Sequence, residues 1–189
     1  MNDINPYQAT STVSGEALDE DLPPEPEARS FGGWLILPFL GLVFTPVTAG
    51  FSLVHTFFPM FSNGVWEGLT SPTSPAYHPM WAVMLSYEML GALGNIALSL
   101  VALTYFINKS RTTPKLIIGF LLYNFVMVFG DELFTHLIPY FETHPSKDEA
   151  KNLGRAAISV LIWVPYFLKS QRVKATFVRH WPRKAAPAL

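Results

Sequence analysis

Long apolar runs alternate with short polar segments along most of this chain. Four runs cover residues 33–59, 81–107, 115–139 and 151–169. Each is close to the roughly 20 residues with which an α-helix crosses the hydrocarbon core of a bilayer. Because the link between the second and third runs is short, these two helices are expected to be antiparallel neighbours. The pattern predicts an all-α integral membrane protein with a four-helix transmembrane bundle over residues 31–170.

The fourth run is the weakest of the set. Its uninterrupted apolar part extends only from Ala156 to Leu168, so it reaches spanning length only if Arg155 lies inside the membrane edge. The four runs show no internal repeat. An inverted-repeat transporter therefore has no support in the sequence.

Small and polar residues recur along the runs at alternating steps of three and four, which places them on one face of each helix. They are Thr45, Thr48, Ser52 and His55 in the first run, Glu88, Asn95 and Ser99 in the second, Asn124 and Asp131 in the third, and Arg155 and Tyr166 in the fourth. In a bilayer such residues favour helix contacts, because they allow close backbone approach and interhelical hydrogen bonds. The stripes predict a compact bundle with polar helix interfaces.

Six ionisable residues are expected to meet in the half of this bundle that faces away from the termini. At ~1.5 Å per residue, Glu88 lies about 10 Å below the boundary near Trp81, and Asp131 reaches a similar depth from the other direction. The full set is Glu88, Asp131, Glu132, His136, His55 and Arg155. Glu132 and His136 also form an i, i+4 pair on their own helix.

Three interpretations of this polar cluster remain open. The first is a structural network in which Arg155 and the histidines neutralise the acids. The second is a cavity open to the outside, in which an acid titrates or binds a cation. One arginine against three acids predicts that at least one of Glu88, Asp131 and Glu132 is protonated at neutral pH.

A metal site is the third interpretation. His55, Glu88, Asp131 and His136 are chemically suitable ligands. Mixed histidine and carboxylate sets arise often by chance, however, and Glu132-x-x-x-His136 is not the HExxH motif of zinc enzymes. We therefore predict no metal, no catalytic residue and no cofactor.

Composition agrees with a membrane protein. Of 189 residues, 50% are hydrophobic and 14% are charged, whereas soluble domains carry about a quarter charged residues. A formal net charge of −1 argues against a nucleic-acid partner. The absence of cysteine excludes disulfides and thiolate metal sites.

Charge is unevenly distributed along the chain. Residues 1–30 hold seven acids and one base, and we predict a disordered acidic cytoplasmic tail there. Placing this tail, the link at 108–115 and the C-terminal segment on one side of the membrane gathers ten Lys and Arg there, against three on the other side. The positive-inside rule then puts both termini in the cytoplasm.

Residues 171–189 are predicted to form a basic amphipathic cytoplasmic tail. Val173, Phe177 and Trp181 recur at steps of four, and basic residues lie between them. A helix with this pattern lies on a membrane surface and is held partly by anionic headgroups. The residues expected to contact lipid or a partner are Trp34, Arg172, Lys174, Phe177 and Trp181.

The stretches GGWLILP, at residues 32–38, and VPYFLKSQRVKATFV, at 164–178, resemble the two ends of a bacterial inner-membrane family of unknown function. This is the four-helix family that includes YdgK. The resemblance implies four helices in the inner (plasma) membrane. It implies no activity and assigns no role to the ionisable residues. Both stretches are expected on the cytoplasmic side, which is where a partner would bind.

These observations predict a non-enzymatic accessory or interaction component of the membrane. Its partner would be an unidentified membrane protein or a second copy of the chain. The alternative function is a small proton- or cation-coupled carrier that uses Glu88, Asp131 and Glu132. A membrane enzyme comes third, because it would need a nucleophile or a metal that no motif supplies.

Overall fold

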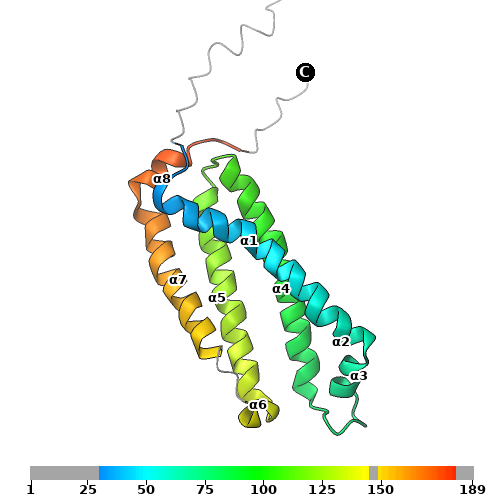
Figure 1. Ribbon diagram of the computed structural model, residues 1–189. Helices are drawn as coiled ribbons and strands as arrows, with labels where there is room; N and C mark the ends of the chain where they lie inside the picture. The colour runs from blue at the N-terminus through cyan, green and yellow to red at the C-terminus, as the bar shows by residue number, and fades with distance from the viewer. Residues whose placement is uncertain (1–29, 145–148, 182–189) are drawn as a thin grey trace, which may run out of the picture.

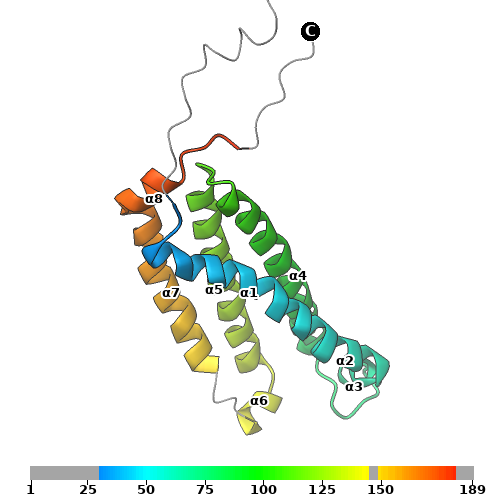
Figure 2. The same cartoon turned by 45° about the horizontal axis from the view of Figure 1, so that its top comes forward.

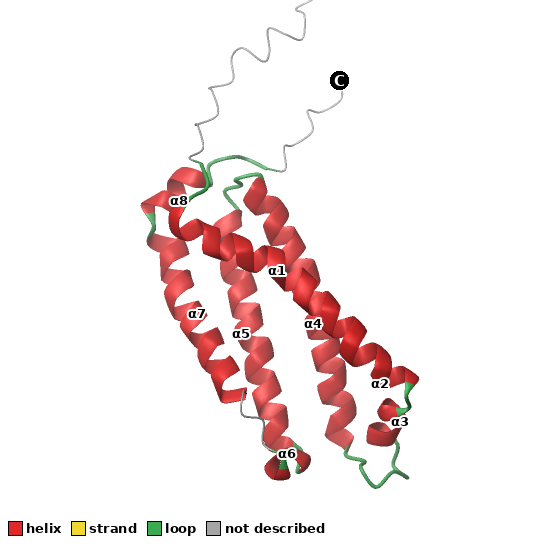
Figure 3. Ribbon diagram, viewed as in Figure 1, coloured by secondary structure: helices red, strands yellow, loops and turns green. Residues whose placement is uncertain are grey.

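The computed structural model describes residues 30–144 and 149–181, and these residues form helices and loops without a β-strand (Figures 1 and 3). The all-α class is therefore confirmed for this part of the chain. The elements are η1 (Gly33–Leu35), α1 (Ile36–Ser52), η2 (Leu53–Phe57), α2 (Phe58–Ser62), α3 (Val65–Thr70), α4 (Pro79–Ile107), α5 (Thr113–Leu137), α6 (Tyr140–Thr143), α7 (Glu149–Lys169) and α8 (Gln171–Thr176). The acidic tail predicted for residues 1–30 lies outside the described residues except for Ser30, and the last part of the basic tail also lies outside them.

Within residues 30–144 and 149–181, three helical stretches are long and apolar enough to cross a membrane: Gly33–Ser62, Pro79–Ile107 and Thr113–Leu137. The first is the continuous run from η1 through α2. All three agree with the predicted apolar runs to within a few residues, and they indicate a membrane protein. The fourth predicted span corresponds to α7, which has 21 residues but is not among the helices apolar enough to qualify.

Helices α4, α5 and α7 lie side by side, and α1 crosses them obliquely (Figures 1 and 2). Helix α5 packs between α4 and α7, while α1 makes most of its helix contacts with α4. This arrangement is more open than the compact bundle that the stripes predict. Helix α1 diverges from α7 along its length, so most of its polar residues face α4 and not α7.

Proline and side-chain caps define where several helices begin. Pro79 lies in the first turn of α4, and Nδ1 of His78 accepts a hydrogen bond from the Met80 amide at 3.3 Å. Pro114 lies in the first turn of α5. Proline is tolerated there because the first amide groups of a helix have no intrahelical acceptor. Ser170 caps α8 by accepting from the Val173 amide.

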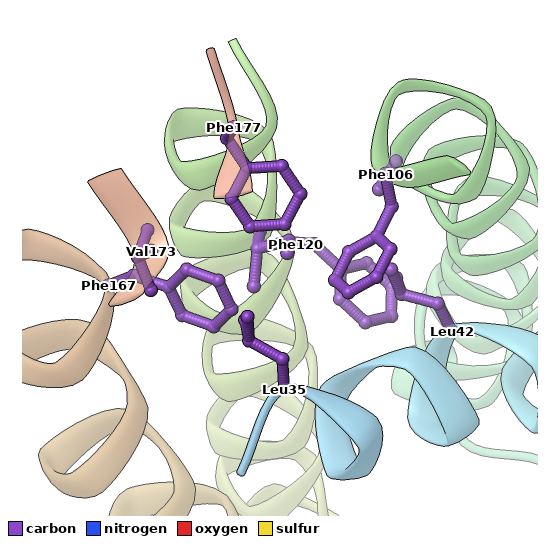
Figure 4. Close-up of a cluster of buried hydrophobic side chains, with 9 residues drawn as sticks. Leu35, Leu42, Phe106, Phe120, Phe167, Val173 and Phe177 are labelled. Atoms are coloured by element: carbon purple, nitrogen blue, oxygen red, sulfur yellow. The ribbon is translucent and has the colours of Figure 1, made fainter. Parts of the chain in front are cut away.

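The main hydrophobic core lies at the end of the molecule where α1 begins and α7 ends (Figure 4). Its buried members are Leu35, Leu42, Ala102, Phe106, Ile117, Phe120, Phe167, Val173 and Phe177. Tyr166, which the sequence placed at a helix interface, packs against this cluster. The core therefore joins the first helix, the α4–α5 hairpin and the C-terminal segment.

The C-terminal segment differs from the amphipathic helix predicted through Trp181. Helix α8 ends at Thr176, and Val173 and Phe177 are only 1% and 4% exposed. The predicted lipid contact of Phe177 is wrong, because its ring lies in the core against Phe106 at a centroid distance of 5.1 Å.

Backbone pairing holds the residues after α8 against the link between α4 and α5. The Arg111 amide donates to the Arg179 carbonyl at 3.0 Å, and the Arg179 amide donates to the Lys109 carbonyl at 3.1 Å. The Trp181 ring packs edge-on to Tyr105 at a centroid distance of 4.7 Å. Apolar residues of this segment are thus used for packing within the protein.

Candidate functional site

A polar groove lies between α1, α4 and α5, with a cavity volume of about 480 Å³. Its polar lining residues are Thr45, Thr48, Ser52, Thr56, Tyr87, Glu88, Asn95, Asn124 and Asp131. We refer to this cavity and its lining as the polar groove. The predicted stripes of the first three runs meet here, because their spacing keeps them on one face of each helix.

Glu88 and Asp131 form a carboxyl pair in the polar groove. Glu88 is on α4 and Asp131 is on the facing part of α5, and their side chains are within hydrogen-bonding reach of each other. Both are half-buried. A hydrogen bond between two carboxyl groups requires a proton on one of them, since a carboxylate only accepts. The two side chains can therefore hold one proton between them.

Two buried acceptor atoms near this pair have no hydrogen-bond partner in the described structure: Oδ1 of Asn95 and Oδ1 of Asp131. The other groove amide, Asn124, uses its Nδ2 to donate to the Phe120 carbonyl at 3.0 Å. An unpaired buried acceptor is costly, and more so where no water is available. Both atoms are buried, so a donor reaches them only if the lining of the groove rearranges.

The hydroxyl groups of the groove wall are mostly satisfied by their own helix. Thr45 Oγ1 donates to the Gly41 carbonyl at 2.8 Å, and Thr48 Oγ1 donates to the Phe44 carbonyl at 3.1 Å. Ser99, predicted to lie at a helix interface, is fully buried and donates to the Ile96 carbonyl at 2.9 Å. The Thr45 and Thr48 hydroxyls thus make the wall polar without being unpaired donors.

The remaining ionisable residues of the predicted cluster do not line the polar groove. Glu132 Oε1 is 3.7 Å from Nε2 of His136, whose side chain is 75% exposed. The His55 ring packs on Phe51 at a centroid distance of 4.0 Å. Among the described residues, no three His, Asp or Glu side chains are placed so that they could hold a metal ion.

Arg155 lines a second cavity, of about 360 Å³, between α1, α5 and α7. Its Nη1 donates to Oδ1 of Asn152 at 3.4 Å. Thr45, Asn124 and Val128 line both cavities, so the two spaces adjoin. The structure thus brings Glu88 and Asp131 together in the polar groove, whereas Arg155 lines the adjoining cavity.

Two tyrosines that the sequence analysis did not single out connect α4 and α5. Tyr87 Oη donates to the Val126 carbonyl at 2.9 Å, and Tyr123 Oη donates to the Gly91 carbonyl at 3.0 Å. A Cβ on Gly94 or Gly130 would overlap the Tyr123 or Tyr87 hydroxyl, respectively. These contacts could have been suspected from the sequence, because the hydroxyl of a tyrosine in the middle of an apolar run needs a hydrogen-bond partner.

Gly130→Ala is expected to destabilise the α4–α5 hairpin by about 1–3 kcal/mol, the usual cost of overpacking. The added methyl displaces the Tyr87 ring and weakens its hydrogen bond to α5. Thermal unfolding in nanodiscs measures the effect. Gly119→Ala is the matched control on the same helix, because nothing lies within 4 Å of its added Cβ. Equal stability of the two variants would contradict this packing.

A family model described as a protein of unknown function, DUF2569, matches residues 28–178. The chain belongs to the DUF2569 family. The match includes residues 32–38 and 164–178, the two stretches that carry the resemblance noted in the sequence. It confirms that the chain belongs to a family of unknown function. No curated protein and no solved structure matches the chain.

In this DUF2569 protein the two end stretches are in contact. A Cβ on Gly32 would lie 2.9 Å from Nη2 of Arg172, and one on Gly33 would lie 3.2 Å from its Nη1. Gly33 also has a φ of +60°, which disfavours other residues. The glycine pair thus makes room for the Arg172 side chain. The neighbouring Trp34 remains 67% exposed and is available to lipid or a partner.

Proposed function

We propose that this DUF2569 protein is a non-enzymatic accessory component of the bacterial inner membrane. In this proposal, its polar groove receives a transmembrane helix of another membrane protein or of a second copy. The observation that carries the proposal is the polar lining of the groove, in which the acceptor side chains of Glu88, Asn95 and Asp131 are half-buried. Inside a bilayer, such acceptors favour a neighbouring helix that supplies hydrogen-bond donors.

The exposed wall of the groove supports the same proposal. Thr48, Ser52 and Thr56 are exposed on the side of the first helix that lines the cavity. Small residues and hydroxyls of this kind allow the close backbone approach on which helix association in membranes depends. A partner helix with small residues and an amide or hydroxyl donor fits this surface.

The proposed membrane arrangement has α7 as a fourth span and both termini in the cytoplasm. Helix α7 runs beside α5 (Figure 1). Its 21 residues extend for about 30 Å at ~1.5 Å per residue, which matches the hydrocarbon thickness. The positive-inside rule supports this orientation, because basic residues concentrate where α4 joins α5 and where α7 ends.

Site-specific photocrosslinking in native membranes tests the groove proposal. A photoreactive residue at Thr48 is expected to give a discrete protein adduct, which Asn95→Leu in the same chain should abolish. The matched control is a photoreactive residue at Ile162, which is 53% exposed and outside the groove. Lipid adducts alone at Thr48, or an adduct that survives Asn95→Leu, would contradict groove docking.

A proton- or cation-coupled carrier is the second candidate. The contact between Glu88 and Asp131 favours it, because a carboxyl pair can exchange a proton for a cation or release it. The adjoining cavity, which is mostly apolar apart from a few residues such as Arg155 and Ser159, extends the space toward α7. Proton flux through proteoliposomes that contain the parent but not the Glu88→Gln/Asp131→Asn variant would favour the carrier over the accessory function.

A further inference from the structure

One end of the molecule is strongly basic. It comprises the start of α1, the link between α4 and α5 with the first turn of α5, and the end of α7 with α8 and the residues after it, and Figure 2 turns it toward the viewer. These segments hold no acid and seven basic residues: Lys109, Arg111, Lys115, Lys169, Arg172, Lys174 and Arg179. We call this surface the basic end. All of these side chains except Lys109 are exposed.

The N-terminal segment joins the structure at this same end. Phe31 stacks on Phe106 at a centroid distance of 5.2 Å, and Nζ of Lys109 lies 5.1 Å from the centre of the Phe31 ring. Ser30 is therefore fixed beside the basic end. Residues 1–29, which precede it, carry seven acids and one arginine.

We propose that the acidic N-terminal segment, residues 1–29, binds the basic end of its own chain. The charges are complementary, with seven acids facing seven bases. The segment is attached where it would bind, and tethering of this kind gives effective concentrations in the mM range. This placement follows from chain connectivity, so it holds whichever side of the membrane the end occupies.

The same basic surface suits anionic phospholipid headgroups, but the tail is the occupant that the charge distribution favours. A segment with this many acids is repelled by an anionic leaflet unless its charge is neutralised. The basic end provides that neutralisation within the chain. At ~3.3 Å per extended residue, 29 residues are long enough to cover every cation of the surface.

Paired spin labels on the full chain in zwitterionic nanodiscs test the proposal. The chain has no native cysteine, so Ser14→Cys with Thr112→Cys gives two unique sites. Thr112 is exposed beside the basic end, and its side chain does not cap α5. We expect a short-distance population at low salt that is lost when salt shortens the Debye length to about 3 Å, near 1 M. Ser14→Cys with Val65→Cys, in α3, is the control pair that should show no short population.

Charge removal gives the second arm of the experiment. The triple variant Lys115→Gln/Lys169→Gln/Lys174→Gln removes three exposed cations outside the core, and it should abolish the short population while the helical circular dichroism is unchanged. Persistence of that population in the folded triple variant would overturn the proposal. A second result would also overturn the proposal: the parent shows no short-distance population at low salt, and phosphatidylglycerol is enriched around it in mixed nanodiscs. Lipid headgroups would then occupy the basic end.

Discussion

Phe106→Ala is expected to lower the free energy of unfolding by about 3–5 kcal/mol, the range for removing a buried aromatic ring. Phe106 has no exposed surface, and its ring contacts that of Phe177 (Figure 4) and those of Phe31 and Phe39. These rings come from the residues before η1, from α1 and from the segment after α8. The cavity left by the substitution cannot close easily, because backbone hydrogen bonds hold the C-terminal segment to the α4–α5 link.

Denaturant titration in mixed micelles measures this change, and Phe44→Ala is the matched control. Phe44 lies on α1 and is 59% exposed, so its removal should change stability by no more than about 0.5 kcal/mol. Equal losses in the two variants would show that the rings around Phe106 are not a stabilising core. A loss confined to Phe106→Ala would show that the two ends of the chain stabilise each other.

The positions of the helices could be predicted from the sequence because the bilayer imposes a strong constraint. Backbone polar groups must be satisfied within each spanning segment, so apolar length alone marks a helix. The proximity of Glu88 and Asp131 could also be predicted from the sequence. They lie almost equally far from the short link between two antiparallel helices, so counting residues along each helix brings them to one depth.

The relative placement of the helices could not be predicted in the same way. Periodicity defines a polar face, but the crossing angle of two helices depends on how their side-chain ridges interlock. Helix α1 crosses its neighbours obliquely, so Arg155 lines a cavity beside the groove and does not meet the acids in it. The roles of Tyr87 and Tyr123 depend on the rotation of α4 and α5, which the sequence pattern leaves undefined.

The C-terminal segment shows a related ambiguity. Apolar residues at steps of four with bases between them are equally compatible with a membrane-surface helix and with a segment that packs on its own protein. The structure has the second arrangement, because Val173 and Phe177 complete a core begun by Leu35 and Phe106. Sequence spacing carries no information about which apolar surface covers such residues.

The double variant Glu88→Gln/Asp131→Asn is expected to lose completely an infrared band of a protonated carboxyl group that the parent shows at neutral pH. The reason is geometric, since two carboxyl groups in mutual hydrogen-bonding reach share one proton. Amides keep the shape of both side chains and can still hydrogen-bond to each other, so the variant should remain folded. Difference infrared spectroscopy in nanodiscs measures the band directly.

Glu132→Gln is the matched control, because Glu132 is the next residue on α5 and its carboxylate is near His136, outside the polar groove. It should leave the band intact. A parent without the band would mean that the pair is ionised and needs a bound cation to hold two carboxylates together. That result would favour the carrier over the accessory function. The other outcome is a band that persists when the salt ions are exchanged and the pH is varied around neutrality. In that case the proton is fixed and neutralises the pair, and the groove can receive an uncharged helix.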